Sequence, residues 1–405
     1  MRNVFILSAV RTPIGKYGGS LSAFSAPDLG TLAAQAALER AGVQPDQVNE
    51  VIFGHARQAG NGPNPARQIA VRAGVPVEVP AYTVNQACAS GLKAIALGYD
   101  QILLERAEVV LAGGTEAMSR VPYFADGARW GTRIGHQQLV DGMYRDGFLC
   151  PLASMVMGET AELLAERYQI SREEQDAFAL SSQQRAARAL ASGRFQDEIA
   201  PVTVKDKKGT RAFSTDEHPR TETSLQSLSR LPAVFSPANS KAGTITAGNS
   251  SGITDGAAAL VLASEDWVKK HAAGRAPLAR IVDYAVAGVD PKTMGLGPVP
   301  AIQKLLTKTG RRLEDYDLIE LNEAFAAQVL ACDRELHFDR ERLNVNGGAI
   351  ALGHPIGCTG ARITVTLLHE MKKRGVRRGL ATLCVSGGLG VAFEVECILR
   401  MGEPQ

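Results

Sequence analysis

Hydrophobic and polar positions along the chain follow two different periods. Short apolar runs that end in polar residues or glycine predict strands, whereas apolar residues that recur every three or four positions predict helices. Over the first 120 residues the pattern predicts strands at 3–10, 50–56 and 107–118, and helices at 28–42 and 89–105. Strands and helices that alternate in this way predict a layered α/β sheet with helical crossovers.

The middle of the chain has a different character. From about 122 to 245, proline, glycine and charged residues become frequent, and the predicted helices are amphipathic. Ser171 and Glu174 have the spacing of a capping box, so a helix is expected to begin there. Segments 205–213 and 216–220 predict turns or a hairpin. We interpret this stretch as an insertion that covers another part of the protein, rather than as more sheet.

The last third alternates strands and helices again and matches the first in order. Residues 83–103 and residues 344–363 each contain a Val-Asn pair, a turn of small residues and a helix, followed by a strand that ends in Gly-Gly. This match predicts a duplicated fold whose equivalent turns meet near a pseudo-twofold axis. The expected elements are a strand at 278–288, a helix at 299–306, a strand leading into a helix at 317–332, and strands at 380–388 and 390–399.

Composition narrows the class of protein. The 405 residues are 45% hydrophobic and 21% charged, which is typical of a globular chain with two or more domains. The formal charge of +2 is too small for a general electrostatic attraction to the phosphates of nucleic acid, so no nucleic-acid partner is expected. Six cysteines without a C-x-x-C pair predict reduced thiols and a cytoplasmic setting. Since no apolar run is long enough to span a bilayer and residues 401–405 carry no targeting signal, no membrane partner is expected either.

Four polar or reactive residues lie in turns rich in glycine, alanine and serine: Cys88, Asn322, His354 and Cys384. Taken singly, each has an ordinary explanation, such as a buried small thiol, a loop histidine or the start of a helix. Together they offer nucleophiles, a base and backbone N–H groups that can approach a ligand closely. Reversible carbon–carbon bond formation between thioesters needs these parts, because it must hold an acyl group, move a proton and stabilise oxyanions.

Cys88 directly precedes a predicted helix. A helix N-terminus and a neighbouring imidazole both favour a thiolate, and His354 could supply the imidazole, so we expect the anion to be favoured at Cys88. A metal site is not expected, because Pro355 and Gly357 interrupt the spacing between His354 and Cys358, and no second ligand pair has zinc spacing. The chain also lacks the G-x-G-x-x-G and Walker A patterns.

These blocks, together with "RTPIGKYGGSL", "AGGTEAMS" and "AGNSSGITDGAAAL", resemble the thiolase family over essentially the whole chain. The resemblance implies an α/β protein of thiolase fold: two duplicated halves, with central helices sandwiched between mixed sheets, and an inserted loop domain. It also implies acyl transfer to and from coenzyme A (CoA), with acyl-CoA and CoA as partners and no permanently bound cofactor. The implied domains are 1–268, with the loop domain at about 122–245, and 275–405.

Carried over by position, the resemblance gives each residue of the four blocks a role. Cys88 would be the acylated nucleophile, and His354 would activate it and help hold the thioester oxygen. Cys384 would remove the α-proton of the second acetyl unit or protonate the leaving enolate. Asn322 would position a water that, together with His354, forms the oxyanion hole for the thioester oxygen. The backbone N–H groups of Cys88 and Ser386 would form a second oxyanion hole. Family members commonly have glycine where Ser386 stands, a change that keeps the backbone donor.

The resemblance also implies a CoA site that includes part of the inserted segment. An arginine near the phosphates is physically reasonable, because guanidinium groups make charge-assisted hydrogen bonds. The implied contacts are Ser251 near the pantetheine, Ala247, Gly248, Ala324 and Phe325 along the channel, Arg220 and Ser227 at the nucleotide end, and Met157 as a further substrate or CoA contact.

Val156 bears on the choice of substrate. Short-chain biosynthetic members usually have His-Met-Gly here, whereas Val156 precedes Met157 in this chain, which leaves room for longer 3-ketoacyl chains than acetoacetyl. The leading hypothesis is reversible thiolysis of 3-ketoacyl-CoA, with Claisen condensation of acetyl-CoA as the reverse. Cys384 argues against a related ketoacyl synthase, and the presence of both nucleophile and base argues against a non-catalytic acyl-CoA or sterol carrier. A homodimer or homotetramer is expected, with contacts through about 123–145.

Overall fold

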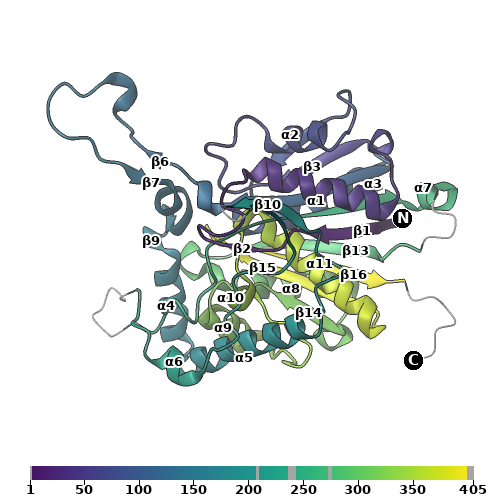
Figure 1. The fold of residues 1–405 in the computed structure, drawn as a ribbon. Coiled ribbons are helices and arrows are strands. Elements are labelled where there is room, and N and C mark those ends of the chain that lie inside the picture. Colours follow the sequence, from purple (N-terminus) through teal and green to yellow (C-terminus); the bar gives the residue numbers. More distant parts are fainter. Residues whose placement is uncertain (1, 207–208, 236–242, 272–275, 399–405) are drawn as a thin grey trace.

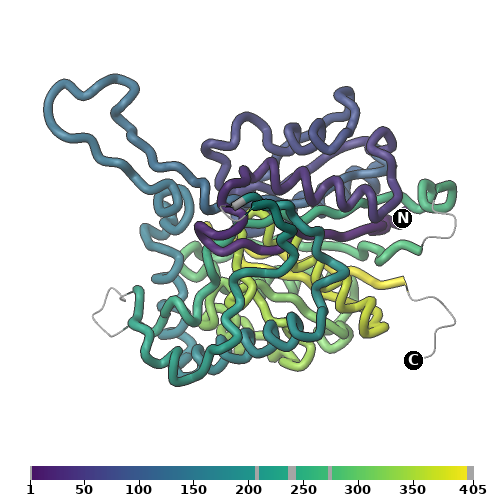
Figure 2. The backbone as a smooth tube through the Cα atoms, viewed as in Figure 1, coloured from purple at the N-terminus to yellow at the C-terminus, as the bar shows by residue number. Residues whose placement is uncertain are grey.

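A computed structural model describes residues 2–206, 209–235, 243–271 and 276–398. The C-terminal residues 401–405, for which no targeting signal was expected, lie outside this range, as do residues 207–208 of the predicted hairpin. Figure 1 shows a layered body from which one narrow arm extends, and Figure 2 shows that the first and last thirds of the chain lie together at its centre. The predicted α/β architecture is confirmed.

The body is organised around one continuous sheet, whose strands follow the order β14-β15-β16-β13-β1-β12-β5-β3-β4, with the short β2 beside β12. Its strands are β1 (Val4–Arg11), β2 (Gly15–Lys16), β3 (Glu50–Gly54), β4 (Ala81–Val84), β5 (Val109–Ala117), β12 (Thr254–Ser264), β13 (Ala279–Gly288), β14 (Leu318–Leu321), β15 (Arg378–Val385) and β16 (Leu389–Cys397). The central strands are apolar and buried on both faces because helices cover them, which explains their nearly unbroken hydrophobic runs.

The helices are α1 (Ala26–Ala41), α2 (Pro65–Arg72), α3 (Ser90–Leu103), α4 (Met157–Arg167), α5 (Arg172–Ala191), α6 (Leu225–Ser229), α7 (Glu265–His271), α8 (Pro298–Thr309), α9 (Ala326–Leu336), α10 (Ala349–Leu352) and α11 (Ile356–Arg374). Most of the predicted helices are found within a few residues of these bounds. The pattern missed α2, α7 and β4, which are too short to show a clear period. Ser171 caps α5 as predicted: its Oγ accepts the N–H of Glu174, and Glu174 accepts the N–H of Ser171.

The two halves of the sheet repeat one plan. In the first half β1, β12 and β5 are antiparallel neighbours and β3 joins β5 in parallel. In the second half β13, β16 and β15 are antiparallel neighbours and β14 joins β15 in parallel. The halves meet where β1 pairs antiparallel with β13. The predicted duplication therefore corresponds to a repeated strand order about this central pair.

The equivalent helices α3 and α11 pack against each other between the halves. A Cβ on Gly91 would lie 2.9 Å from the backbone N of Ala361, and one on Gly360 would lie 2.5 Å from the backbone N of Leu92. The helices approach this closely because glycines occupy both contact positions. Their first turns meet, since Gly91 also lies against the carbonyl of Gly357. The segments that precede the two helices are thereby brought to one place.

The inserted segment lies between β5 and β12. It contains α4 to α6 and three hairpins, β6 (Tyr123–Phe124) with β7 (Val140–Asp141), β8 (Leu149–Cys150) with β9 (Met155–Val156), and β10 (Val202–Asp206) with β11 (Gly209–Phe213). The buried guanidinium of Arg11 anchors this segment to β1 through Glu198 (2.6 Å) and Asp216 (2.7 Å). The arm in Figure 1 runs between β6 and β7 and exposes Trp130 and Ile134.

Candidate active site

Cys88 lies in a tight turn between β4 and α3. The residues Ala87–Ala89 form a single 3-10 turn, and Ala87 has a left-handed backbone (φ 44°), which is uncommon for a residue with a Cβ. Ser90 holds this turn, because its Oγ accepts the N–H of Gln86 (2.9 Å) and donates to the carbonyl of Ala87 (2.7 Å). The strained turn fixes the position of the thiol at the head of a buried helix.

The surroundings of the Cys88 thiol are mainly apolar. It packs against a cluster that contains Ala56, Met143 and Ile356, the first residue of α11. Burial raises the pKa of the Cys88 thiol, and Arg57 and the backbone N–H of Ser386 oppose this only in part. The expectation that the thiolate is favoured at Cys88 is therefore wrong for the free protein, because burial raises the pKa more than Arg57 and the backbone N–H groups lower it. A base must take the thiol proton before Cys88 can act as a nucleophile.

His354 lies between α10 and α11 with its ring buried. Its backbone N–H donates to the carbonyl of Gly252 (3.0 Å), and its Nδ1 lies 2.6 Å from Oγ1 of Thr359. The Thr359 hydroxyl donates its proton to the carbonyl of Pro355, so it accepts a hydrogen bond from Nδ1–H of His354. This tautomer leaves a lone pair on Nε2, which is buried and has no hydrogen-bond partner among the described residues.

The imidazole of His354 is held in its neutral form. Burial, together with the positive charges of Arg362 and Arg57, lowers its pKa to about 3. At neutral pH the ring is therefore uncharged, and its unpartnered Nε2 lone pair is the group that a proton acceptor needs. The geometry therefore provides a proton acceptor of fixed orientation.

Cys384 and Asn322 lie at the ends of neighbouring parallel strands. Cys384 is near the end of β15, just before a turn in which Gly387 and Gly388 both have positive φ. Asn322 directly follows β14, and its N–H donates to the carbonyl of Thr382 on β15 (3.0 Å). The side-chain amide of Asn322 is buried, and neither its Oδ1 nor its Nδ2 has a partner among the described residues. Such an amide is available to hold a water or a substrate atom.

The segments that carry these residues meet around the turn at Cys88. This turn contacts both α11 and β15, and the backbone N–H of Ser386 is directed at the Cys88 sulfur. Cys384 lies close enough for charge on Cys88 to act on it, and burial followed by this charge raises the pKa of the Cys384 thiol well above its ordinary range. Cys384 is therefore a neutral thiol that can donate a proton, beside a second thiol that can become charged.

The residues expected to contact CoA fall into two neighbouring groups. Arg220, Ser227, Ala247 and Gly248 line one cavity of about 280 Å³ between the inserted segment and the loop before β12. The second group is nearer the thiols. The N–H of Ser251 donates to the carbonyl of Ala324 (3.0 Å), and Phe325 pairs with the residue before Ser251. Ala324, Phe325 and Met157 belong to the apolar cluster of Cys384.

Comparison with known proteins identifies the family. Two sequence profiles match the chain, "Thiolase, N-terminal domain" over residues 4–266 and "Thiolase, C-terminal domain" over residues 275–397. The chain belongs to the thiolase family. It is 53% identical over 394 residues to the acetyl-CoA acetyltransferase of Pseudomonas aeruginosa, an alignment that covers 97% of this chain and 99% of that protein.

Solved thiolase structures have the same fold. The acetyl-CoA acetyltransferase of Bacillus anthracis aligns with a TM-score of 0.94 at 50% identity, covering 98% of this chain and 99% of that one. Human mitochondrial 3-ketoacyl-CoA thiolase in complex with CoA aligns with a TM-score of 0.93 at 46% identity, covering 98% of each chain. The thiolase fold predicted from the sequence motifs is thereby confirmed.

Three charged or polar residues of this thiolase site were not predicted from the sequence. His55, Arg57 and Glu116 are buried behind Cys88, where Glu116 accepts the N–H of Gly357 at the start of α11 (2.8 Å). Burial alone raises the pKa of Glu116, but His55 and Arg57 lower it to below its usual range, so the carboxylate is charged. Glu116 lies in the quoted "AGGTEAMS" block, but only the fold places it beside the nucleophile.

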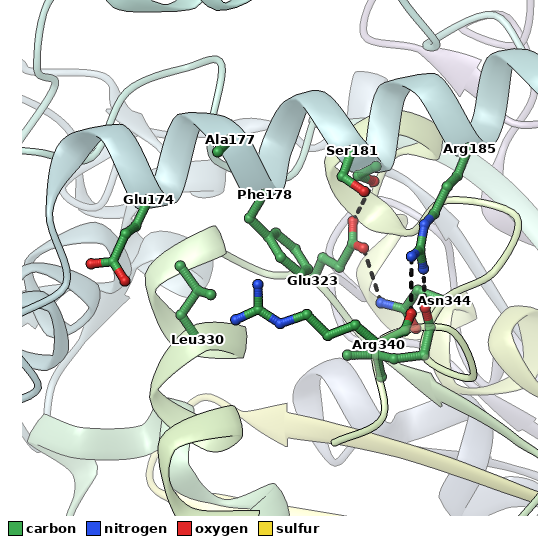
Figure 3. A pocket seen from close by; sticks show the side chains of 11 residues that line it. Glu174, Ala177, Phe178, Ser181, Arg185, Glu323, Leu330, Arg340 and Asn344 are labelled. Atoms are coloured by element: carbon green, nitrogen blue, oxygen red, sulfur yellow. Dashed lines mark hydrogen bonds between the residues drawn. The ribbon is translucent and has the colours of Figure 1, made fainter. Parts of the chain in front are cut away.

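A second buried carboxylate supports the segment of Asn322. Glu323 accepts hydrogen bonds from Ser182 on α5 (2.7 Å) and from Asn344 (2.9 Å). Figure 3 shows the bond between Glu323 and Asn344. It lies at the floor of a cavity of about 210 Å³ that Arg185 and Arg340 also line. These contacts tie the loop after β14 to the inserted segment, and so fix the backbone that carries Asn322 in the thiolase.

Metal and membrane features were sought within the described ranges. These residues hold no cluster of three or more His, Cys, Asp or Glu side chains with the arrangement of a metal site. None of the helices in the part of the chain that the structure describes combines the length and apolar content of a membrane span.

Proposed function

We propose that this chain is an acyltransferase that cleaves 3-ketoacyl-CoA with CoA and, in reverse, condenses two acetyl-CoA molecules, through an acyl group on Cys88. The observation that supports this most directly is that the segments carrying Cys384 and His354 meet around the turn at Cys88. Relatives named acetyl-CoA acetyltransferase, about half identical over nearly the whole chain, support the same reaction class. A carrier or ketoacyl synthase is not favoured, because both thiols and the imidazole are present.

Acylation begins with proton transfer from Cys88 to Nε2 of His354. The Cys88 thiolate then attacks the 3-keto carbon, and the bond between C2 and C3 breaks. The electron pair leaves as the enolate of acetyl-CoA, which takes a proton from the Cys384 thiol. The thiol of CoA then gives its proton to Cys384 and attacks the acyl group on Cys88, which releases the shortened acyl-CoA. His354 returns its proton to the sulfur of Cys88.

Two oxyanions develop during this sequence, and each has its own donors in the proposal. The backbone N–H groups of Cys88 and Ser386 stabilise the oxygen of the acyl group on the nucleophile. Protonated Nε2 of His354 and a water held by Asn322 stabilise the thioester oxygen of the enolate. The unpartnered amide of Asn322 supports this role, because it is buried and has no protein hydrogen bond among the described residues.

CoA enters these steps as a substrate. We propose that Arg220 and Ser227 bind its nucleotide end, Ala247 and Gly248 line the channel, and Ser251, Ala324 and Phe325 surround the pantetheine, with Met157 near the acyl group. The solved complex of human mitochondrial 3-ketoacyl-CoA thiolase with CoA supports this use of the site. The cavity of about 280 Å³ that Arg220 and Ser227 share has a charged group for the phosphates.

We also propose an organisation in two thiolase domains, 1–268 with the loop domain at 122–245, and 275–405. The exposed Trp130 and Ile134 on the arm support self-association as a homodimer or homotetramer. Six unpaired cysteines support a reducing, cytoplasmic setting. Val156, which stands where a shorter-chain enzyme would have histidine, supports acceptance of longer 3-ketoacyl chains.

The test is thiolysis of acetoacetyl-CoA by free CoA, followed as the loss of enolate absorbance, and then of a series of longer 3-ketoacyl-CoA substrates. We expect cleavage with incorporation of the acyl group into protein, and the series gives the chain-length preference. If no substrate of the series is cleaved by protein whose Cys88 can still be alkylated stoichiometrically, the activity is excluded and the carrier alternative is favoured.

A further inference from the structure

His218 lies between the CoA cavity and the backbone that carries the catalytic histidine. The residue belongs to the segment 216–220, which the sequence pattern predicted only as a turn. Its half-buried ring lines the same cavity of about 280 Å³ as Arg220. Nothing in the reaction sequence above gives His218 a role, although its neighbour Arg220 is assigned to CoA.

One ring nitrogen of His218 is committed to the segment just before His354. Its Nδ1 donates to the carbonyl of Ala351 in α10, at 2.8 Å. Burial and then Arg220 lower the pKa of His218, while the Ala351 carbonyl acts in the opposite direction. The ring is therefore neutral and has a single N–H, which it uses on Ala351.

The Nε2 side of the ring packs against Gly252, in the loop whose backbone binds His354. A Cβ added to Gly252 would lie 1.8 Å from Nε2 of His218, so the ring rests directly on the Gly252 backbone. The carbonyl of Gly252 accepts the backbone N–H of His354 at 3.0 Å. His218 thus touches both stretches of main chain, 349–352 and 252, that determine where His354 sits.

The main chain at this point has little freedom to adjust. Gly353, between Ala351 and His354, has φ +98°, and a Cβ on it would lie 2.3 Å from Cγ2 of Thr254. A small shift of either supporting segment therefore moves the imidazole instead of being absorbed by a nearby loop. Catalytic geometry is sensitive at this scale, since a misplacement of about 1 Å can cost about 100-fold in rate.

We propose that His218 is a positioning residue for His354: it holds Ala351 and Gly252, which belong to the two backbone segments next to His354, and links their geometry to the cavity for the CoA nucleotide. The inference rests on the proposed function, because it assumes that His354 takes the Cys88 proton. His218 need not touch the reacting atoms. It acts through the backbone on the residue that does.

The experiment compares two acetyl donors. Acetyl-CoA fills the nucleotide cavity, whereas acetyl-N-acetylcysteamine carries only the thioester end of the pantetheine. For His218→Ala we expect the acylation rate of Cys88 to fall about tenfold to 100-fold with both donors. Arg220→Ala is the comparison for a residue that acts on the nucleotide end, and its loss should appear as a higher KM for acetyl-CoA. His271→Ala, an exposed histidine on α7, is the control and should leave acylation by both donors within about twofold of wild type.

Two conservative variants keep the proposal testable where the alanine variant folds poorly. The side-chain N–H of Asn lies where Nδ1 of histidine does, so His218→Asn should recover acylation, whereas His218→Gln should remain slow. Loss confined to acetyl-CoA in His218→Ala would make His218 a CoA contact and overturn the proposal, as would equal rates in the Asn and Gln variants. Failure of the wild-type protein to cleave acetoacetyl-CoA would contradict the proposed function instead.

Discussion

Two thiols share one site in this protein, but their surroundings differ. Cys88 sits in a strained turn. The charge of Arg57 and the backbone N–H of Ser386 lower the pKa of its thiol and so oppose the effect of burial. Cys384 is on a regular strand, fully buried, and burial and the neighbouring sulfurs of Cys88 and Cys332 raise its pKa. The two side chains are chemically identical, so only their surroundings make Cys88 suited to carry an acyl group and Cys384 suited to keep and donate a proton.

The largest expected effect is the loss of the acylated sulfur. Cys88→Ser should lower the rate of acetoacetyl-CoA thiolysis by about four orders of magnitude or more, because a serine hydroxyl at this site is a far poorer nucleophile. The rate is measured by loss of enolate absorbance. Cys397→Ser, at the far end of β16, is the matched control and should stay near wild type. A Cys88→Ser enzyme with a tenth of wild-type activity would contradict the assignment.

The second variant separates the two thiols by step. Cys384→Ser should acylate Cys88 from acetyl-CoA within about threefold of wild type, but should lower condensation by about 1,000-fold, since general acid–base catalysis contributes about 10²–10⁴. Quenched-flow measurement of acetyl-enzyme and steady-state assay of acetoacetyl-CoA report the two steps separately. Equal loss in both would remove the distinction between a nucleophile and a proton donor.

The third variant tests whether Asn322 serves the Cys384 step. Asn322→Ala should lower thiolysis of acetoacetyl-CoA by about 100-fold, the usual cost of an oxyanion-hole donor, while acetyl transfer from acetyl-CoA to Cys88 changes little. Ile319→Val, on the preceding strand β14, is a control for general disturbance of this region. If Asn322→Ala lowered thiolysis and acetyl transfer equally, the amide would serve to stabilise the loop, and its role in the Cys384 step would be contradicted.

The smallest expected effect concerns the charge that distinguishes the thiols. Removing the guanidinium in Arg57→Leu should raise the pKa of the Cys88 thiol further, because the thiolate loses a stabilising positive charge. Iodoacetamide labelling of Cys88 at pH 8 should slow about tenfold for each unit of this rise. Labelling of Cys384 should not change. Arg72→Leu, an exposed arginine on α2, provides the comparison, and a labelling profile for Arg57→Leu that coincides with it would contradict this role.

Much of the fold could be predicted from the pattern, because most strands and helices are long enough to show a period. The repeated order of 83–103 and 344–363 predicted two equivalent halves, and the assignment of Cys88, His354 and Cys384 to one reaction stays a prediction from the motifs. The short elements α2, α7 and β4 were missed for lack of a period. The contacts of Arg11 on β1 with Glu198 and Asp216 anchor the inserted segment. A local sequence pattern cannot predict contacts between residues so far apart in the chain.

The electrostatics of the site could not be predicted from the sequence. A helix N-terminus led us to expect a favoured thiolate at Cys88, whereas the structure packs this partly buried residue against the apolar cluster of Ala56, Met143 and Ile356. Arg57 and Glu116 are 59 residues apart in sequence and become neighbours only when β3 and β5 pair. His218 likewise acquires meaning only from its contacts with Ala351 and Gly252.

The most direct measurement is the location of the acyl group. Protein incubated with isotopically labelled acetyl-CoA, quenched in acid and mapped by peptide mass spectrometry should carry one acetyl group on the peptide that contains Cys88, in wild type and in Cys384→Ser alike. Label on the peptide of Cys384, or retention of a thioester-bound label in Cys88→Ser, would contradict the distinct duties assigned to the two sulfurs.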